Sequence, residues 1–249
     1  MSRGRPRGDF RAARRLGAEP VRRQHVARLS VPEHVTDGPA FSWWRDATIG
    51  FYGKIPARGD FVCVGLPRGF VDPWHAWIER MLAASRDELG EEWQPAWLEA
   101  AVWRFALPAG LCGPEPVVGL WLPSVDHVGR YFPLTFALVA RFGDPVELIR
   151  DAGWFFRIAE DAGRAALEGD LAPEALAARL HEALSASPLD PGIDPRPLAA
   201  ADGVWWTEGA PRVPPHVFTR RDLPDGATFT AMLDARGAAS QPLEPVARE

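Results

Sequence analysis

Residues 102–142 read VWRFALPAGLCGPEPVVGLWLPSVDHVGRYFPLTFALVARF, a stretch with three apolar runs separated by short segments rich in glycine and proline. The runs cover residues 102–108, 115–123 and 131–142. They are rich in valine, phenylalanine and tryptophan, which favour β-strands. Because each run is bounded by Gly or Pro and the connections are short, the stretch predicts three successive strands that pair antiparallel.

Two further strand-like runs precede this stretch. They are ATIGFYGKIP at residues 47–56 and RGDFVCVGL at residues 58–66, joined by a turn around Pro56 to Gly59. Proline and glycine in this turn punctuate the chain in the way that is typical of a strand connection. The sequence therefore predicts a pair of short strands ahead of the three-strand stretch.

A helix is predicted between these two groups of strands. It begins after residues 66–71, where Asp72 can cap it and Pro73 occupies its first turn, and Gly90 follows its last turn. A shorter helix follows near Trp93. Apolar residues recur in the first helix at helical spacing, so one face should be buried: Trp74, Trp77, Ile78, Met81, Leu82 and Leu89.

The start signal of a helix appears again after the three-strand stretch. Asp144 can cap the helix, Pro145 can occupy its first turn, and Glu147 lies three residues after the cap. We expect this helix to continue to Gly169 and a second helix to begin at about Pro173.

The C-terminal part predicts two more strands and a short helix. A proline-rich surface connection at residues 187–198 precedes the strand candidates GVWWTEG at 203–209 and PHVFTR at 215–220, and the helix lies near Phe229. The order is ββα(α)βββαα and then ββα. It predicts an α+β fold, a mostly antiparallel sheet of five to seven strands flanked by helices. This order is similar to the ββαβββα core of longin-like and profilin-like domains, an analogy of fold that implies no function.

Charge is distributed unevenly along the chain. The whole chain has a formal net charge of −5, but residues 1–30 contribute +7 and the remaining residues −12. We expect residues 1–45 to be a disordered basic tail, or translated sequence upstream of a later start, with a nucleic-acid or acidic-lipid tail as the alternative. Residues 46–237 should form a single α+β domain, and residues 238–249 a disordered C-terminal tail. The acidic body argues against nucleic-acid binding by the folded part.

The expected compartment follows from cysteine content and hydropathy. The chain has two cysteines, Cys63 and Cys112, which imply no disulfide framework. The simpler expectation is that both are reduced thiols. No stretch reaches the roughly 20 apolar residues needed to span a bilayer, and the arginine-rich start lacks the apolar core of a secretory signal. We therefore expect a soluble cytoplasmic protein without a membrane span.

Common catalytic templates are missing from the sequence. It contains no GxSxG, GxxxxGK[ST], HExxH or paired CxxC motif, and its six histidines never lie at ligand spacing. We expect no cofactor, no metal and no enzymatic activity. One alternative stays open: Ser124, Asp126 and His127 lie close together and could serve a hydrolase. The competing interpretation is a turn in which Ser124 and Asp126 bond backbone amides and Gly129 is left-handed.

Several charged and aromatic residues remain as candidates for a partner site. Lys54 is the only lysine beside 27 arginines, and an ammonium is more compact than a guanidinium. We expect Lys54 to face solvent or a partner, and Asp60 to form a largely internal pair with Arg130. Trp205 and Trp206 could form an exposed aromatic platform. Alternatively, strand alternation places their rings on opposite faces of the sheet, one of them in the core.

Six sequence blocks, taken in order, resemble the TagF (ImpM) family of bacterial type VI secretion accessory proteins. They are GFYGKIPARGDFV at 50–62, LPRGFVDPWHAWI at 66–78, SRDELGEEW at 85–93, WRFALPAGLCG at 103–113, GLWLPSVDHVGRYFPLT at 119–135 and VWWTEG at 204–209. A single GKxPxxGDF block would be a weak signal, whereas six blocks in order are specific. Residues 1–45 lie outside the resemblance.

The resemblance implies a non-enzymatic cytoplasmic regulator that restrains assembly or firing of the type VI apparatus after translation. The partner that it implies is a forkhead-associated scaffold protein, in a pathway with a serine/threonine kinase and a PP2C-type phosphatase. A structural subunit of the secretion machine remains the alternative, and a hydrolase is a further one.

The family blocks also group the candidate residues. Lys54, Arg58 and Asp60 fall on the GKxPxxGDF block, whereas Ser124, Asp126 and Arg130 fall on the PSVDxVGRYFP block. If both blocks are loops at one end of the sheet, they form a mixed-charge surface suited to a polar partner.

Overall fold

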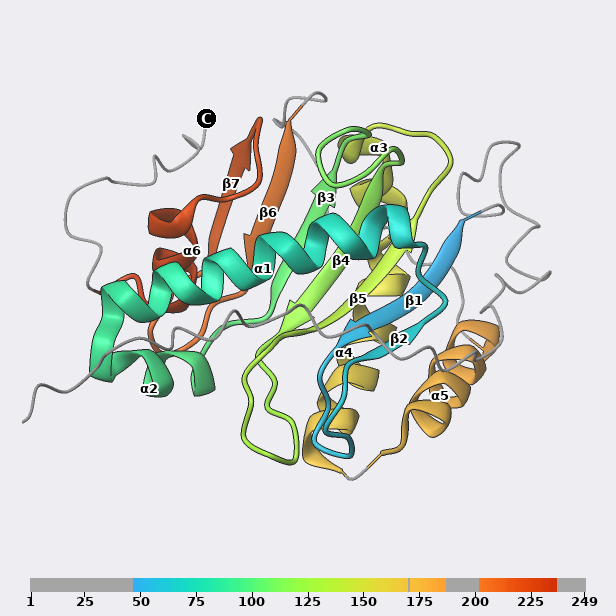
Figure 1. Ribbon diagram of the computed structural model, residues 1–249. Coiled ribbons are helices and arrows are strands. Elements are labelled where there is room, and N and C mark those ends of the chain that lie inside the picture. The colour runs from blue at the N-terminus through green and yellow to red at the C-terminus, as the bar shows by residue number, and fades with distance from the viewer. Residues whose placement is uncertain (1–46, 170, 187–201, 237–249) are drawn as a thin grey trace, which may run out of the picture.

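A seven-stranded sheet runs through the part of the chain that the computed structural model describes, residues 47–169, 171–186 and 202–236 (Figure 1). Its order is β2-β1-β5-β4-β3-β6-β7, and every pairing is antiparallel. The α+β class and the mostly antiparallel sheet are confirmed. The predicted tails at 1–45 and 238–249 and the predicted connection at 187–198 lie outside the described residues.

The strands coincide with the apolar runs of the sequence. They are β1 (Thr48–Gly53), β2 (Val62–Val64), β3 (Trp103–Leu107), β4 (Val117–Leu122), β5 (Leu134–Val139), β6 (Gly203–Thr207) and β7 (His216–Arg220). Strands β3, β4 and β5 are buried at every position. Helices cover both faces of these strands, which is why their sequences are apolar at nearly every position instead of alternating, with Arg104 and Thr135 as the exceptions.

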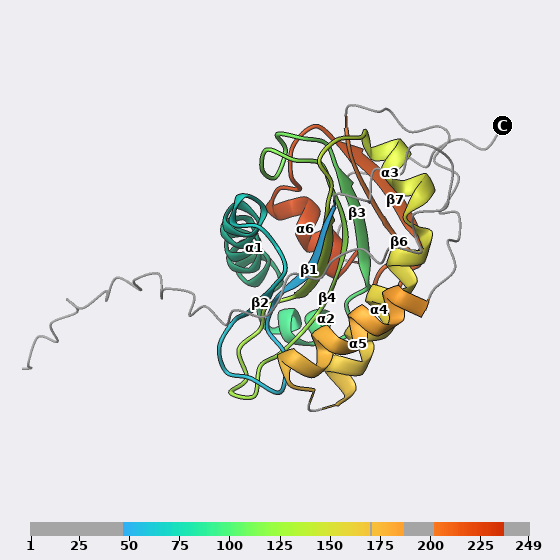
Figure 2. The same cartoon turned by 90° about the vertical axis from the view of Figure 1, so that its right-hand side faces the viewer.

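Two layers of helices enclose the sheet, as Figure 2 shows when the sheet is viewed nearly edge-on. One layer contains α1 (Arg68–Leu89), the single 3-10 turn η3 (Gly90–Glu92), α2 (Trp93–Leu98) and α6 (Gly226–Leu233). The other contains α3 (Pro145–Asp151), α4 (Gly153–Glu168) and α5 (Pro173–Ala186). No helix in the described ranges is both long enough and apolar enough to cross a membrane.

Helix α1 begins earlier than the sequence predicted. Its first residue is Arg68 and its N-cap is Pro67, so Asp72 is not the cap and Pro73 lies inside the helix. Asp72 instead faces solvent and forms an ion pair with Arg68 at 3.6 Å. The preceding turn is helical because Phe70 and Val71 are buried in the core, and this burial outweighs the local capping preference.

The predicted helix between Asp144 and Gly169 is divided in two. Asp144 does cap α3, since its carboxylate accepts a hydrogen bond from the backbone N–H of Glu147 at 3.0 Å. The chain leaves helical geometry at Ala152, with φ −101° and ψ 9°, and resumes as α4. The break lets α3 pack on β3 and β4 while α4 continues over β4 and β5.

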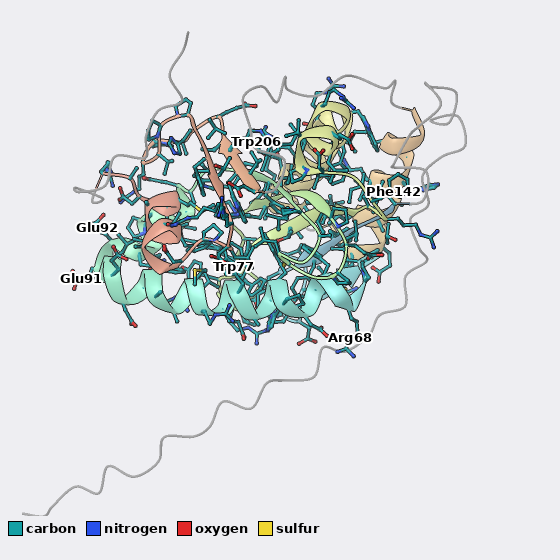
Figure 3. The ribbon with its side chains drawn as sticks, turned by 90° about the horizontal axis from the view of Figure 1, so that it is seen from above. Arg68, Trp77, Glu91, Glu92, Phe142 and Trp206 are labelled. Carbon is teal, nitrogen blue, oxygen red and sulfur yellow. The ribbon has the colours of Figure 1, made fainter. Side chains whose placement is uncertain are left out.

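Each layer of helices forms its own core against the sheet. The core under α1 is dominated by tryptophan, whereas the core under α4 is mostly aliphatic and phenylalanine-rich. Figure 3 shows Trp77 on the α1 side of the sheet and Trp206 toward the opposite layer. Several indole N–H groups under α1 are hydrogen-bonded, for example Trp74 to the Thr135 hydroxyl at 3.0 Å and Trp103 to the Met232 carbonyl at 3.0 Å.

Candidate functional site

Two loops meet at one end of the sheet, the lower end in Figure 1. The first loop connects β1 to β2 and carries Lys54. The second connects β4 to β5 and carries Asp126. Gly53 makes their approach possible, because a side chain at this position would collide with the carbonyl oxygen of Pro133. Its φ of 143° also disfavours any residue other than glycine.

A buried ion pair joins the two loops. The Lys54 Nζ donates a 2.5 Å hydrogen bond to Asp126 Oδ2, and both residues are only 4% exposed. The same ammonium lies 3.4 Å from the Gly59 carbonyl oxygen and 4.7 Å from the centroid of the Phe61 ring. Lys54 therefore has a carboxylate, a carbonyl and an aromatic face around one compact charge, which is a set of contacts suited to an ammonium.

Asp126 also shapes its own loop. Its Oδ1 accepts the backbone N–H groups of Val128 at 3.0 Å and Arg130 at 2.8 Å. Gly129 is left-handed, with φ 84°, as the turn interpretation predicted. Burial by itself would raise the pKa of Asp126, but hydrogen bonds from Lys54 and Arg130 outweigh it and lower the pKa to about 2. Asp126 is therefore negatively charged at neutral pH, and it holds the two loops together through its bonds to Lys54 and to its own loop backbone.

Ser124 provides a second tie between the loops. Its hydroxyl donates a 2.8 Å hydrogen bond to the Lys54 carbonyl oxygen, and its own carbonyl accepts the indole N–H of Trp97 at 3.2 Å. The residue is buried, whereas His127 is exposed. The Ser124 proton is directed to a backbone carbonyl, and Asp126 is paired with Lys54. Ser124, His127 and Asp126 are therefore not arranged in this loop as the nucleophile, base and orienting carboxylate of a hydrolase.

The expected exposures of Lys54, Asp60 and Arg130 were wrong. Lys54 is buried, while Asp60 and Arg130 are exposed. Arg130 pairs with Asp126, at 2.8 Å from its Nε to Oδ2, instead of with Asp60. Its Nη2 donates to the Gly59 carbonyl oxygen and so also reaches the other loop. The cause is local geometry: Asp126 and Arg130 lie four residues apart in a turn closed by the Asp126 N–H and the Arg130 carbonyl at 3.0 Å.

An exposed rim surrounds this buried centre. We use "loop rim" for its five residues, Arg58, Asp60, His127, Val128 and Arg130. Val128 is 58% exposed at the tip of the β4–β5 loop. Arg58 lies 3.7 Å from Glu174 of α5, an exposed pair of little energetic weight. The sequence did not single out Val128 or Phe61, because an apolar residue near strands is normally assigned to the core.

Trp205 and Trp206 do not form an exposed platform. Both are buried, Trp205 in the core under α1 and Trp206 in the core under α4. Strand β6 lies between β3 and β7. Trp205 packs against Trp74 and Trp77 of α1, whereas Trp206 packs against Phe156 of α4. The alternation of the strand was predicted correctly, but both rings are in a core because the sheet is covered on both faces.

The described residues hold two free cysteines, Cys63 and Cys112. Burial raises the pKa of both thiols, to about 12 for Cys112, so both are poor nucleophiles at neutral pH. Within these ranges no three His, Cys, Asp or Glu side chains are grouped so that they could hold a metal ion.

Comparison with known proteins points in one direction. The family profile of the TagF N-terminal domain, described as type VI secretion system-associated, matches residues 50–183, which include both loops. A crystal structure of PA0076 from Pseudomonas aeruginosa PAO1 is 35% identical in sequence and aligns with a TM-score of 0.65. The alignment covers 81% of this chain and 100% of that chain. No curated protein matches. Since the profile covers more than half of the sequence and the solved structure is similar along most of it, the chain belongs to the TagF family of type VI secretion system-associated proteins.

Proposed function

We propose that this TagF-family protein is a non-enzymatic cytoplasmic regulator, and that it restrains the type VI secretion apparatus by binding a partner protein through the loop rim. The observation that carries the proposal is the Lys54–Asp126 ion pair, which holds two exposed loop tips in one fixed arrangement. A preorganised surface loses less conformational entropy on binding than two independent loops would.

The chemistry of the loop rim suits a polar protein surface. It offers cationic side chains at Arg58 and Arg130, an acidic one at Asp60, and an apolar contact at Val128. Mixed charges around an apolar centre are typical of specific, transient interfaces. We take a forkhead-associated scaffold protein as the partner, in a pathway that includes a serine/threonine kinase and a PP2C-type phosphatase.

The test is calorimetric titration of the protein against the forkhead-associated scaffold encoded in the same secretion gene cluster, in phosphorylated and unphosphorylated form. Val128→Asp should weaken binding at least tenfold, because it places a carboxylate in the apolar centre of the rim. Phe142→Asp is the matched control, since Phe142 is also a half-exposed apolar residue but follows the opposite end of β5. Circular dichroism checks that both variants are folded.

The outcomes separate the parts of the proposal. Binding by the wild type that Val128→Asp leaves unchanged would reject the loop rim as the site but keep the partner. Absence of binding by the wild type in both scaffold states would reject the partner. Stable co-assembly with structural components of the machine would instead favour the alternative role, a structural subunit.

A further inference from the structure

A second polar site lies at the same end of the sheet, beyond α2. It is a pocket of about 380 Å³ between the segment that enters β3, the segment that leaves β6, and α4. Its charged residues include Arg104 from β3, Glu160 and Arg164 from α4, and Glu208 after β6. None of these residues belongs to the loop rim.

Arg104 is the centre of this pocket. It is a charged residue on an inner strand and is only 9% exposed. Its neighbour on the adjacent strand β6 is Trp206. Its Nη2 contacts two carboxylates, Glu160 Oε2 at 2.5 Å and Glu208 Oε1 at 3.0 Å. Within the described part of the chain, the guanidinium of Arg104 makes its hydrogen bond and its ion pairs through Nη2 alone. A guanidinium has five N–H donors, so Nε and Nη1 retain capacity for an acceptor in the pocket.

The two carboxylates on Arg104 are not equivalent. Glu160 has a side chain that is 16% exposed, and Arg164 also holds it, with Nη2 at 2.5 Å and Nε at 3.1 Å from Oε1. Glu208 has a side chain that is 83% exposed, and its one ion pair in the described residues is with Arg104. An ion pair with such an exposed partner contributes little, so Glu208 can leave Arg104 at small cost.

We propose that this pocket binds a carboxylate of a ligand, which takes the place of Glu208 on Arg104. From that position a carboxylate reaches Nη2 together with Nε or Nη1, the two-pronged geometry that arginine favours. Glu160 is paired with Arg164 and Glu99 with Arg212, so displacement of Glu208 leaves one uncompensated positive charge, that of Arg104. A single carboxylate matches this charge, so a monocarboxylate is preferred over phosphate. Leu98 and Pro211 add apolar surface, which selects an apolar group beside the carboxylate.

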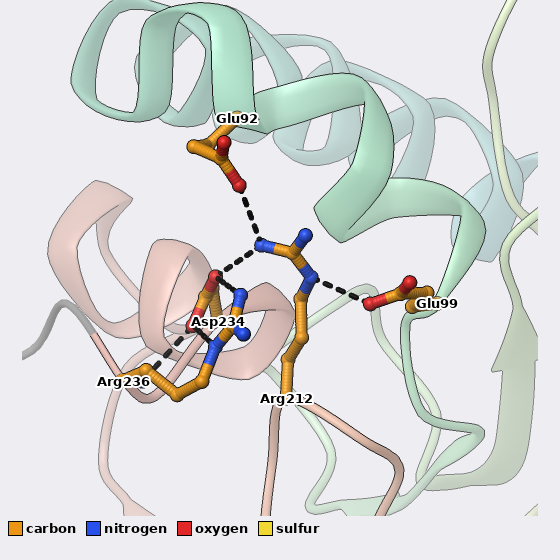
Figure 4. Close-up of polar contacts among 5 residues, drawn as sticks. All are labelled: Glu92, Glu99, Arg212, Asp234 and Arg236. Carbon is orange, nitrogen blue, oxygen red and sulfur yellow. Dashed lines mark hydrogen bonds and ion pairs between the residues drawn. The ribbon is translucent and has the colours of Figure 1, made fainter.

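A network around Arg212 preforms the pocket (Figure 4). The Arg212 side chain is buried and donates from Nε to Glu99 at 2.7 Å and from Nη1 to Asp234 at 2.7 Å and to Glu92 at 3.0 Å. Arg236 also donates to Asp234. Glu99 belongs to one wall of the pocket and Arg212 follows Pro211 in the other, so the network fixes the two walls relative to each other. The ligand therefore enters a site that is already ordered.

The probe is N-acetyl-leucine, which carries a carboxylate beside an apolar side chain, and its neutral control is N-acetyl-leucine amide. Binding to the full chain is followed by the ¹⁵N–¹H signal of the Trp206 indole, next to Arg104 in the sheet. We expect a saturable shift with the acid, none with the amide, and weaker effects from inorganic phosphate. Val128→Asp should retain the shift, which separates this site from the proposed partner surface.

The direction in which Glu208→Gln changes the affinity for the acid is the decisive result. Because it removes the competing carboxylate, it should tighten binding of the acid by about two- to fivefold, whereas Arg104→Met should abolish binding. If Arg104→Met does not fold, the Glu208→Gln result and the acid–amide comparison still decide. Equal shifts with acid and amide, no shift with either, phosphate binding as tight as the acid, or weaker binding in Glu208→Gln would each overturn the proposal.

A second comparison distinguishes the two sources of such a carboxylate. A leucine-terminated tetrapeptide that binds more tightly than N-acetyl-leucine identifies a polypeptide C-terminus as the ligand, and equal affinity identifies a small acid.

Discussion

The Lys54 ammonium and the Asp126 carboxylate form a 2.5 Å ion pair across 72 residues of sequence, with both side chains buried. The pair connects the β1–β2 loop to the β4–β5 loop. It also accounts for the only lysine of the chain. The site has room for one compact charge between a carboxylate, a carbonyl and the face of Phe61.

Exchange of Lys54 tests this account. Lys54→Met should lower the free energy of unfolding by about 3 kcal/mol, at the lower end of the cost of breaking a buried pair, because Arg130 still contacts Asp126. Lys54→Arg should cost about 1–3 kcal/mol, since the larger guanidinium overpacks the site. Both values come from urea unfolding. Arg58→Met, at an exposed position of the same loop, is the control and should change stability by less than about 0.5 kcal/mol. A Lys54→Arg variant as stable as the wild type would contradict the steric explanation.

Stability should depend on pH through Asp126. Its pKa is lowered from 3.8 to about 2 in the folded protein, so its contribution is present above the unfolded-state value and is lost as the pH falls through the folded-state value. The stability difference between the wild type and Asp126→Asn should therefore shrink by about 2 kcal/mol between pH 5 and pH 2. Other depressed carboxyl pKa values, such as that of Asp225, affect both proteins and cancel in the difference. A difference that stays constant over this range would show that the charge of Asp126 does not contribute.

Arg130 should be energetically coupled to Asp126 and not to Asp60. A double-mutant cycle of Asp126→Asn with Arg130→Ala should give a coupling energy above about 0.5 kcal/mol, because the two side chains form a hydrogen-bonded ion pair. The cycle of Asp60→Ala with Arg130→Ala should be additive within about 0.5 kcal/mol. The reverse order of the two couplings would mean that Arg130 pairs with Asp60 in solution.

Two glycines of these loops should respond differently to alanine. Gly53 and Gly129 both have positive φ, at 143° and 84°, but only at Gly53 does a Cβ collide with neighbouring backbone, the Pro133 carbonyl. Gly129→Ala should cost about 1 kcal/mol from backbone conformation alone. Gly53→Ala should cost on the order of 3 kcal/mol or more, because the two loops must separate. Thermal unfolding compares the two variants, and equal costs would show that Gly53 is not closely packed against the Pro133 carbonyl in solution.

Much of the fold could be predicted from the sequence. The runs at 102–108, 115–123 and 131–142 indicated three adjacent strands because β-branched and aromatic residues and bounding glycines act locally. The start of α3 at Asp144 was predicted by its capping signal for the same reason. The start of α1 was missed because burial of Phe70 and Val71 in the core, a tertiary effect, extended the helix past a plausible cap at Asp72.

The sequence by itself determined the α+β class, the strand order along the chain and the six ordered blocks shared with the TagF family, because these depend on local composition and spacing. Only the tertiary structure decided that Lys54 is buried on Asp126, that Arg130 and Asp60 are exposed, and that Arg104 lines a pocket. Those outcomes depend on which segments the sheet brings within a few ångströms of each other. Asp126 has one charged partner four residues away, Arg130, and another in a distant loop, Lys54. The sequence shows both residues but not their distances from Asp126 in space, and these distances set the energies of solvation and pairing.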